Sequence, residues 1–587
     1  MKSALEQVVA AAVKDVYGLA VTVELTRPEP QFGDYATNVA LQLAKQLGQN
    51  PRTIAETLAN HVKGQSSHIV AAEVAGPGFL NLRLSDQTLL DGLHETPEKP
   101  LAGQTIVTEY SDPNPFKVLH IGHFYTGVVG DAISNVLQNA GAHVHRVNFG
   151  GDVGLHVGKT MWAIIRELGG EKPEKLADIP VDERSEWMAR CYVAGTQAYE
   201  DDETARREII AANKRVYSLH SENDHDSAFA SIYWTCRTWS YDYFDAFYER
   251  IGSSFERYYP ESQTAELGLA TVKEQLAKGV FEESDGAVVF DGEKYGLHTR
   301  VFINSEGLPT YETKDVGLSR KKWEDYRFDT SVIITGNDIV EYMKVVLKAI
   351  EQFAPNLAQR TRHITHGNVK LAGGVKMSSR KGNFVRAVDV LDLAREANQA
   401  IAGRNNESTV LAAIKYSFLK NRIGADIIFE PKESVALEGN SGPYLQYAHA
   451  RARSILSKAQ AATGALHASG ERSESGEGEP TSDEGAALSE PAQATAERQT
   501  TLEPGERLLV CKLTEYPEVI AKTTSELMPH YICTYLYELA QEFNRFYEKN
   551  RVIGDGREAV RLRLVEAYAE TLQNGLALLG IAAPERM

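Results

Sequence analysis

The sequence has few cysteines and no long hydrophobic run. The four cysteines are far apart, and none of them forms a Cys-x-x-Cys pair, which argues against a disulfide framework and against a structural zinc site. No stretch of eighteen consecutive apolar residues occurs, so we do not expect a transmembrane helix. The sequence is therefore typical of a protein of the reducing cytoplasm, without a membrane anchor and without a dedicated metal site.

Positive charge is also scarce, because the 587 residues carry a formal net charge of −18. Binding to a phosphate backbone requires local clusters of Lys and Arg. However, the segment from Ser469 to Glu506 has ten acidic residues against two arginines, so it contributes about −8 and leaves about −10 for the rest. This segment is rich in Ser, Gly, Glu, Thr and Pro, and we expect it to be a disordered insertion at about residues 462–505. The net charge alone does not exclude a nucleic-acid partner.

The chain is too long for one hydrophobic core, and the pattern of predicted helices and strands changes twice along it. Residues 1–98 begin with helical patterns and end in VAAEVAGPGFLNLRLS, which predicts two strands around a turn and hence a small α+β domain. Residues 99–400 alternate short β-type runs, TIVTEY, AVVF and SVIIT, with helical runs, which indicates an α/β domain with a Rossmann-type parallel sheet. Residues 401–587 have almost only helical patterns and predict an all-α domain.

A His-Ile-Gly-His motif, His120 to His123, lies between the predicted strand TIVTEY and a long helical run. In an open α/β sheet this order places a helix N-terminus at the ligand crevice, where it attracts phosphate. The two histidines are three residues apart, so we expect them to share one helical face, and Gly122 has no Cβ to block a purine or ribose. Two ordinary surface or core histidines are the alternative. A rival P-loop interpretation of GGDVGLHVGKT fails, because the required first glycine is Val153.

The second motif is the segment GGVKMSSRKGNF, which spans Gly373 to Phe384. Its basic residues lie among small ones, and the ordinary interpretation is a solvated basic loop. In the same domain as the first motif, the segment also fits a cationic loop that closes over a triphosphate. Together the two motifs, HIGH and KMSSR, resemble the HIGH and KMSKS signatures of the class I aminoacyl-tRNA synthetases.

Further segments narrow the resemblance to the arginyl-tRNA synthetase family. They are QFGDYATNVALQLAK, AGPGFLNLRL, YSDPNPFKVLHIGH, FERYYPES, GLPTYETKDVG, NSGPYLQYAHARARS and LLGIAAPERM. They occur in the family's order and extend from about residue 31 to Met587, apart from the acidic insertion. Several separate matches in order make this a specific signal.

The resemblance implies a domain plan and an activity. Residues 1–98 would be the additional domain that contacts the D-loop side of the tRNA elbow, and residues 99–400 the class I catalytic domain with a connective segment inserted at about 160–300. Residues 401–587 would bind the anticodon. The enzyme would join L-arginine to tRNA(Arg) through an arginyl-adenylate and release AMP and pyrophosphate. ATP would be a substrate with Mg²⁺, which needs no protein cage, and the protein would be a cytoplasmic monomer.

The resemblance also assigns residues. The catalytic set is Lys117, His120, His123, Lys376 and Arg380. ATP would contact His120, Gly122, His123, Lys376, Ser378, Ser379 and Arg380. Arginine would be held by Glu109, Asn114, Glu261, Tyr311 and Asp315, with Asp315 pairing the guanidinium. The tRNA would contact Phe79 and Asn81 in the first domain, and Tyr444, Arg451, Tyr547 and Met587 in the last.

The chain departs from the family pattern at Ser379, where KMSKS has its second lysine, and Lys117 is a candidate substitute for that cation. Asn337 and Asp338 lie near a family substrate motif but differ from its commoner letters, so either adenosine or arginine could be their neighbour. Two alternatives stay open at this point. One is a class I synthetase for another amino acid, such as cysteine, and the other is a non-catalytic tRNA-binding relative.

Overall fold

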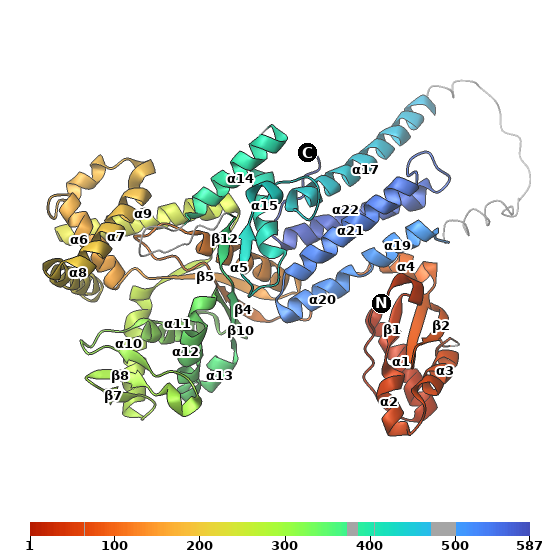
Figure 1. The fold of residues 1–587 in the computed structure, drawn as a ribbon, viewed down its shortest axis with the longest axis horizontal. Coiled ribbons are helices and arrows are strands. Elements are labelled where there is room, and N and C mark those ends of the chain that lie inside the picture. The colour runs from red at the N-terminus through yellow and green to blue at the C-terminus, as the bar shows by residue number, and fades with distance from the viewer. Residues whose placement is uncertain (64, 373–384, 404–405, 471–500) are drawn as a thin grey trace, which may run out of the picture.

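The computed structural model describes residues 1–63, 65–372, 385–403, 406–470 and 501–587. Three parts follow one another along the chain (Figure 1): an N-terminal domain, a central α/β domain with insertions, and a bundle of long C-terminal helices. The predicted fold class is confirmed. The second motif, residues 373–384, lies outside the described residues, and so do residues 471–500 of the acidic insertion.

The N-terminal domain packs helices against a small antiparallel sheet. Its elements are α1 (Lys2–Tyr17), β1 (Tyr35–Thr37), α2 (Val39–Leu47), α3 (Pro51–Val62), β2 (Ile69–Ala75), β3 (Phe79–Leu84) and α4 (Asp86–Gly92). The strand order is β1-β3-β2, with β3 antiparallel to both neighbours. The predicted turn between β2 and β3 contains Gly78 at φ 144°, where a Cβ would come within 2.9 Å of the Pro51 backbone. Glycine is required there because the turn lies against α3.

The central domain is built on one parallel sheet. Its strands are β4 (Thr105–Glu109), β5 (His143–Gly150), β6 (Arg257–Pro260), β10 (Thr330–Gly336) and β11 (Thr361–His366), in the order β11-β10-β4-β5-β6. Every pairing is parallel. Helix α5 (Ile121–Asn139) covers one face and packs on Ile106 and Val332; α11 (Tyr311–Tyr326) and α12 (Val340–Phe353) cover the other and pack on Val107. Strand β10 has the continuous apolar run, Val332 to Ile334, that burial on both faces favours, whereas β5 and β11 mix apolar with polar residues.

Two insertions leave the sheet, where the sequence predicted one connective segment at about 160–300. The first, between β5 and β6, comprises α6 (Leu155–Glu167), α7 (Arg184–Asp201), α8 (Glu203–Ser221) and α9 (Ala228–Ile251). The second, before β10, comprises α10 (Glu261–Ala277), the antiparallel sheet of β7 (Glu282–Ser284), β8 (Ala287–Phe290) and β9 (Arg300–Ile303), and α11. The chain returns between them to form β6, whose four residues are too short to stand out in the sequence.

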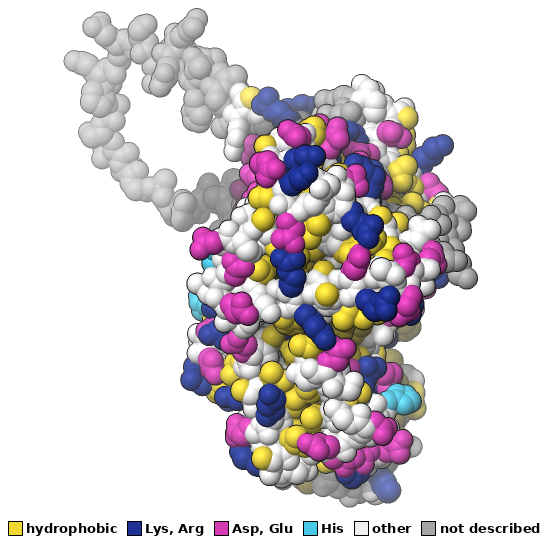
Figure 2. Space-filling model, turned by 90° about the vertical axis from the view of Figure 1, so that its left-hand side faces the viewer, with side chains coloured by type: hydrophobic (Ala, Val, Ile, Leu, Met, Phe, Trp, Pro, Cys, Tyr) yellow, Lys and Arg dark blue, Asp and Glu magenta, His cyan; other side chains and the backbone are white. Residues whose placement is uncertain are grey.

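The insertions form the end of the molecule shown in Figure 2. Acidic and basic side chains are interspersed over this face, with apolar atoms between them. The described side chains on it therefore do not present the continuous positive field that would attract a phosphate backbone. Among the described residues, no helix combines the length and the apolar character needed to cross a bilayer.

The last part is helical, with one short strand. It comprises α14 (Ala387–Ala402), α15 (Glu407–Leu419), β13 (Ile427–Phe429), α16 (Pro431–Ser434), α17 (Gly442–Gly470), α19 (Pro504–Leu513), α20 (Tyr516–Glu526), α21 (His530–Lys549) and α22 (Glu558–Leu578). Strand β13 pairs in parallel with β12 (Val369–Leu371) of the preceding domain. Helix α17 continues to Gly470, past the predicted start of the insertion at about 462, and α19 begins at Pro504.

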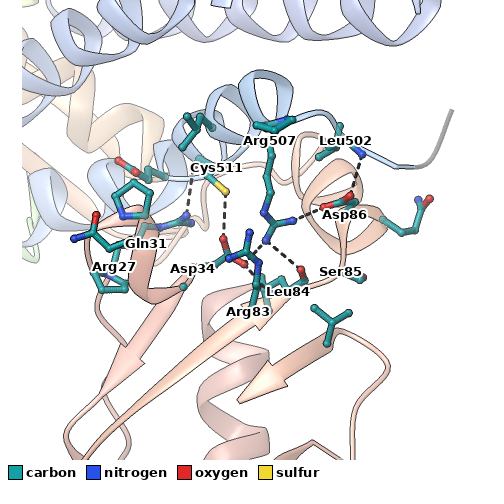
Figure 3. Close-up of a pocket in the computed structure, with 18 of the residues that line it drawn as sticks. Arg27, Gln31, Asp34, Arg83, Leu84, Ser85, Asp86, Leu502, Arg507 and Cys511 are labelled. Atoms are coloured by element: carbon teal, nitrogen blue, oxygen red, sulfur yellow. Dashed lines mark hydrogen bonds and ion pairs between the residues drawn. The ribbon is translucent and has the colours of Figure 1, made fainter. Parts of the chain in front are cut away.

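The N-terminal domain docks on α19 and α20 through two arginines. Figure 3 shows Arg507 of α19 pointing between Asp34 and Asp86 of the N-terminal domain; its guanidinium also donates to the Leu84 carbonyl at 3.2 Å. From the other side, Arg27 pairs with Glu518 of α20 at 2.7 Å and donates to the Thr514 carbonyl at 2.9 Å. A cavity of about 840 Å³ separates the two contacts. Apolar residues of the N-terminal domain and of α19 share one hydrophobic core, and the ion pairs add directional contacts that fix the orientation of the domain.

We expect Arg507→Met to lower the free energy of unfolding by about 2 kcal/mol, because two half-buried carboxylates lose their counter-charge. Urea titration followed by circular dichroism measures the change. Arg52→Met is the matched control, since Arg52 pairs with Glu56 on the exposed surface of α3, and it should leave the midpoint unchanged. Equal midpoints for wild type and Arg507→Met would show that other contacts hold the domain.

Candidate active site

The site lies at the carboxyl ends of the central strands. A cavity of about 1020 Å³ opens there between the end of β4, the start of α5 and the first residues of α10, α11 and α12. Most of the sequence-predicted substrate residues line it: Glu109, Asn114, His120, Gly122, His123, Glu261, Tyr311, Asp315 and Asp338. The fold thus brings together residues that are more than two hundred positions apart in the chain. This is where ligands bind in open α/β sheets.

The two histidines cap the N-terminus of α5. His120 is the N-cap residue and precedes the helix, which corrects the expectation that both histidines lie on one helical face. Its Nδ1 accepts from the Gly122 N–H at 3.0 Å, and Nδ1 of His123 accepts from the His120 N–H at 3.2 Å. The rings stack with centroids 3.7 Å apart. The reciprocal capping box satisfies two N–H groups that would otherwise lack partners.

Both imidazoles are neutral at physiological pH. Burial, assisted by the charge of Lys117, lowers the pKa of His120 to about 4. Burial also lowers the pKa of His123 well below its usual range, and His120 and Lys117 add to the effect. Because Nδ1 of each ring accepts from the backbone, the single proton of each neutral ring is on Nε2. The pair therefore offers two N–H donors beside a helix N-terminus, which suits an anionic ligand.

Gly122 has a reason for being glycine within the protein itself. A Cβ at this position would come within 2.8 Å of Cε1 and 2.9 Å of Nδ1 of His120. The absent side chain makes room for the capping imidazole. The sequence suggested room for a nucleotide as the reason, and that role stays a prediction.

Lys117 lies on the same side of the site. Its ammonium is 4.5 Å from the ring centroid of Tyr192 on α7, and its charge contributes to lowering the pKa of both histidines. It also acts on the Glu261 carboxylate from that position. Lys117 is therefore a cation near the histidines and the inserted helices, although its side chain is not among the residues that line the cavity.

The described residues on both sides of the KMSSR segment lie at the cavity. Val369, in β12, lines it, and the chain leaves β12 through Ala372, whose N–H donates to the Phe429 carbonyl at 3.1 Å. The chain returns at Val385, whose carbonyl accepts from the N–H of Ile121, the first residue of α5, at 2.9 Å. The predicted residues Lys376, Ser378, Ser379 and Arg380 lie outside the described residues. Their segment is attached to the cavity at both ends.

Carboxyl groups dominate the other half of the cavity, and two of them are paired with buried lysines. Glu109 forms an ion pair with Lys322 of α11, which also donates to the Ser331 hydroxyl at 3.1 Å. Glu261 forms an ion pair with Lys314 at 2.5 Å. Burial acts to lower the pKa of Lys314, but the Glu261 carboxylate outweighs it and raises that pKa, so the lysine keeps its charge. Neither glutamate carries an uncompensated charge.

Asp315 has a different partner. Its carboxyl group accepts a hydrogen bond from the Tyr342 hydroxyl of α12 rather than pairing with a cation. Burial raises the pKa of Asp315 to about 8, with Glu109 acting in the same direction, while the Tyr342 hydrogen bond and Lys322 lower it. Burial and Glu109 likewise raise the pKa of Asp112, which accepts from the Phe149 N–H at 2.8 Å. Burial thus favours the protonated form of both carboxyl groups, and a cation placed beside Asp315 would favour its charged form.

Several of these residues escaped the sequence reasoning. Asp112, Lys314 and Lys322 sit inside or near quoted segments, but nothing in their spacing shows which carboxylate each lysine meets. No sequence motif indicated that Tyr342 lies in the site. A tyrosine in a helical pattern is ordinarily core, and only the packing of α12 against α11 brings it to Asp315.

Asn337 and Asp338 have different surroundings in the structure. The Asn337 amide donates to the Gly424 carbonyl at 3.0 Å and holds the backbone. Asp338 lines the cavity, and its charge opposes the lowering of the His120 pKa. It therefore faces the histidine half of the site. The P-loop alternative is excluded, because Gly158, Lys159 and Thr160 lie inside α6, where Gly158 packs against Asn213 of α8.

The other predicted residues fall into two groups far from the cavity. On α17 and α21, Arg451 lies over the Tyr547 ring, 4.7 Å from its centroid, and the Tyr444 hydroxyl accepts from Asn544 at 2.9 Å. Met587 ends a tail that runs along α17, where the Pro584 carbonyl lies 2.9 Å from Nδ1 of His449.

In the N-terminal domain Phe79 is 41% exposed, whereas Asn81 is buried in the central strand β3. Asn81 therefore presents little surface to a partner.

Family models match nearly the whole chain. The model of the tRNA synthetases class I (R), catalytic domain, matches residues 87–430. The arginyl tRNA synthetase N terminal domain model matches residues 2–84, and the DALR anticodon binding domain model matches residues 445–587. A Rossmann-type sheet with the capping histidines at its ligand edge defines the protein as a class I aminoacyl-tRNA synthetase. More narrowly, the chain belongs to the class I (R) family, the arginyl-tRNA synthetases.

Individual relatives agree with the family over their full length. The arginine–tRNA ligase of Porphyromonas gingivalis is 29% identical over 99% of both chains, and that of Bdellovibrio bacteriovorus is 29% identical over 98% of this chain and 95% of its own. The arginyl-tRNA synthetase structure from Thermus thermophilus has a TM-score of 0.76 at 25% identity and covers 100% of both chains. That from Plasmodium falciparum has a TM-score of 0.75 at 18% identity and covers 100% of this chain and 99% of its own.

We expect His120 and His123 to remain neutral, with the proton on Nε2, from pH 5.5 to pH 8, because burial and Lys117 oppose a second proton. Histidine-selective ¹³C and ¹⁵N labelling with NMR measures the tautomer and the titration directly. The variants His120→Gln and His123→Gln assign the two signals. A midpoint near pH 6.5 for either ring would contradict the buried, backbone-capped geometry.

Proposed function

We propose that this chain activates L-arginine with ATP and transfers the arginyl group to tRNA(Arg). One observation carries the proposal: a single cavity joins two neutral histidine donors at a helix N-terminus to a buried aspartate that forms no ion pair with any described residue. The first half fits the phosphates of ATP, and the second half fits one guanidinium. Because both face the same space, one carboxylate and one α-phosphorus can meet there.

In the activation step, an oxygen of the arginine carboxylate attacks the α-phosphorus of ATP. The bond from this phosphorus to the β-phosphate oxygen breaks, and pyrophosphate leaves with its electron pair. His120 and His123 donate through Nε2 to the phosphate oxygens as negative charge builds, and they need no change of protonation for this task. Lys117 adds a positive charge at the same edge. Lys376 and Arg380 hold the leaving pyrophosphate from the segment whose ends lie at the cavity, next to Ser378 and Ser379.

Mg²⁺ would shield the negative charge of the triphosphate. At nucleotide sites this ion usually takes most of its ligands from phosphate oxygens and water, so it would not need a dedicated set of protein ligands here. Among the described residues, no group of three His, Cys, Asp or Glu side chains could hold a metal ion.

The amino acid is selected by charge. Lys322 and Lys314 cancel the charges of Glu109 and Glu261, so Asp315 pairs the guanidinium, with Tyr311 at the mouth of the pocket. Asn114, whose side-chain oxygen accepts from the Gly151 N–H at 2.7 Å, is held beside Glu261 to meet the α-amino and carboxylate end. Neutral side chains of similar size leave the carboxyl of Asp315 without its cation.

In the transfer step, the 2′-hydroxyl of the terminal ribose attacks the carbonyl carbon of the adenylate, and AMP leaves. The RNA is held at two distant places. Tyr444, Arg451, Tyr547 and the tail ending at Met587 contact the anticodon loop by stacking and by guanidinium contacts. Exposed Phe79 contacts the D-loop side, with Asn81 behind it in the sheet. The chain carries all of these elements itself, and we propose that it works as a monomer in the cytoplasm.

ATP–pyrophosphate exchange tests the activity. We expect exchange with arginine and tRNA(Arg), and none with other amino acids; exchange with another amino acid, or none at all with bound RNA, would contradict the proposal.

Asp315→Asn should lower kcat/KM for arginine roughly 100-fold. The Asp315 carboxyl, with a pKa of about 8 in the free enzyme, must lose its proton to pair the guanidinium, so the KM for arginine should fall from pH 6.5 to 8.5. Asp315→Asn should abolish that pH dependence.

Lys117→Ala should lower the rate of adenylate formation at least about tenfold, because a cation beside the phosphates is lost in the transition state. Single-turnover measurements with saturating arginine isolate this step, and the KM for arginine should change little. Lys159→Ala is the comparison variant. The Lys159 ammonium of α6 also lies over a tyrosine ring of α7, that of Tyr199, but the lysine charge that acts on His120 and His123 is that of Lys117. A change confined to the KM for arginine would refute the role of Lys117.

A further inference from the structure

Helix α5 connects the histidines to the far end of the chain. It begins after His120, and its second half meets the last turn of α22. There the Asn135 amide donates to the carbonyls of Ala577 and Leu578, at 3.3 Å each. Arg146 donates to the Asn135 side-chain oxygen at 2.7 Å and so orients the amide toward α22. One rigid element therefore carries the catalytic histidines and contacts the anticodon-binding domain.

A buried lysine ties the same two places together. Lys415 of α15 is only 4% exposed, and its ammonium donates to the Gly580 carbonyl, directly after α22, at 2.8 Å. Asp131 of α5 supplies the charge that opposes the lowering of the Lys415 pKa by burial. Asp131 in turn accepts from the Tyr110 hydroxyl, one residue after β4, at 2.7 Å. A single ammonium thus links the core of the catalytic domain to the C-terminal end of α22.

Helix α15 reaches both sides of this junction. Its Phe418 ring packs on Phe124 and Tyr125 of α5, with centroids 5.5 and 5.3 Å away, directly after His123. On its other side, the Tyr416 hydroxyl donates to the Cys533 carbonyl of α21 at 3.0 Å. A displacement of α15 would therefore change the packing of the aromatic rings at the start of α5.

The tail after Gly580 continues the connection to α17. Gln446 donates to the Ala582 carbonyl at 2.8 Å, and Arg453 pairs with Glu585 at 3.2 Å. These contacts alternate along α17 with Tyr444 and Arg451, the proposed anticodon contacts. The tail is thus held by the same helix that meets the RNA, and its beginning is held by Lys415.

We propose that Lys415 and Asn135 are positioning residues that couple occupation of the anticodon surface to the alignment of His120 and His123. The inference rests on the proposed function, because it requires that the enzyme charges tRNA(Arg). RNA bound along α17 shifts the tail and the end of α22 by small amounts. The Lys415–Gly580 and Asn135–α22 contacts pass that shift to α5, and the histidines at its start move with it. Packed helices transmit such shifts because they are nearly incompressible.

The test is a double comparison of enzyme and RNA. The aminoacylation kcat is measured for the wild-type protein and for Lys415→Met, each with a tRNA(Arg) transcript and with the same transcript carrying a replaced anticodon. In the wild type we expect anticodon replacement to lower kcat at least about fivefold, the lower end of typical coupling between sites. In Lys415→Met this ratio should approach one, because the remaining activity no longer senses the anticodon.

A merely structural role predicts something else. It would lower kcat by the same factor with both transcripts and leave their ratio as in the wild type, and that result would overturn the proposal. Asn135→Ala, a milder change, serves if Lys415→Met does not fold, and it should reduce the ratio in the same direction. Gln138→Ala is the matched control, since Gln138 also binds Arg146 at 2.7 Å but does not reach α22; its ratio should equal that of the wild type. Failure of the wild type to charge either transcript with arginine would instead refute the proposed function.

Discussion

The N-terminus of α5 is the point on which the active site depends. A helix that begins at the edge of a sheet has N–H groups without partners, and here Nδ1 of His120 and Nδ1 of His123 each accept from one backbone N–H, which places the ring proton on Nε2. The same cap requires a glycine at position 122 and receives the chain again at Val385, after the second motif. The hydrogen bonds that cap the helix therefore also orient the two Nε2–H groups toward the cavity, so a change in the cap would change the donors that we propose for catalysis.

Charge compensation shapes the rest of the cavity. Carboxyl groups from β4, α10 and α11 come close together, which would be costly without partners in a buried site. Two buried lysines neutralise two of them, whereas Asp315 has the Tyr342 hydroxyl as its hydrogen-bond donor and no ion pair among the residues that the structure describes. The selectivity of such a pocket for a single positive charge results from the number of unpaired carboxyl groups, not from the number of acidic residues that line it.

Both peripheral domains are joined to the rest of the protein by apolar packing. One continuous hydrophobic core contains Leu89 and Leu90 of the N-terminal domain, Leu509 of α19 and Phe124 of α5. At the N-terminal junction, Arg27 and Arg507 add ion pairs on the two sides of a cavity. These directional contacts, added to the shared core, distinguish the attachment of the N-terminal domain.

The sequence by itself determined the fold class and the strand-loop-helix order around the first motif, because these depend on local periodicity and on spacing along the chain, and its motifs predicted nine of the residues that line the cavity. It placed His120 in the helix rather than at its cap, and it described one insertion where β6 divides two. Which lysine neutralises which glutamate, the contact of Tyr342 with Asp315, and the meeting of Lys415 with Gly580 were decided only by the tertiary structure. Such contacts join residues of different helices, and a pairing in space leaves no period in the sequence from which it could be read.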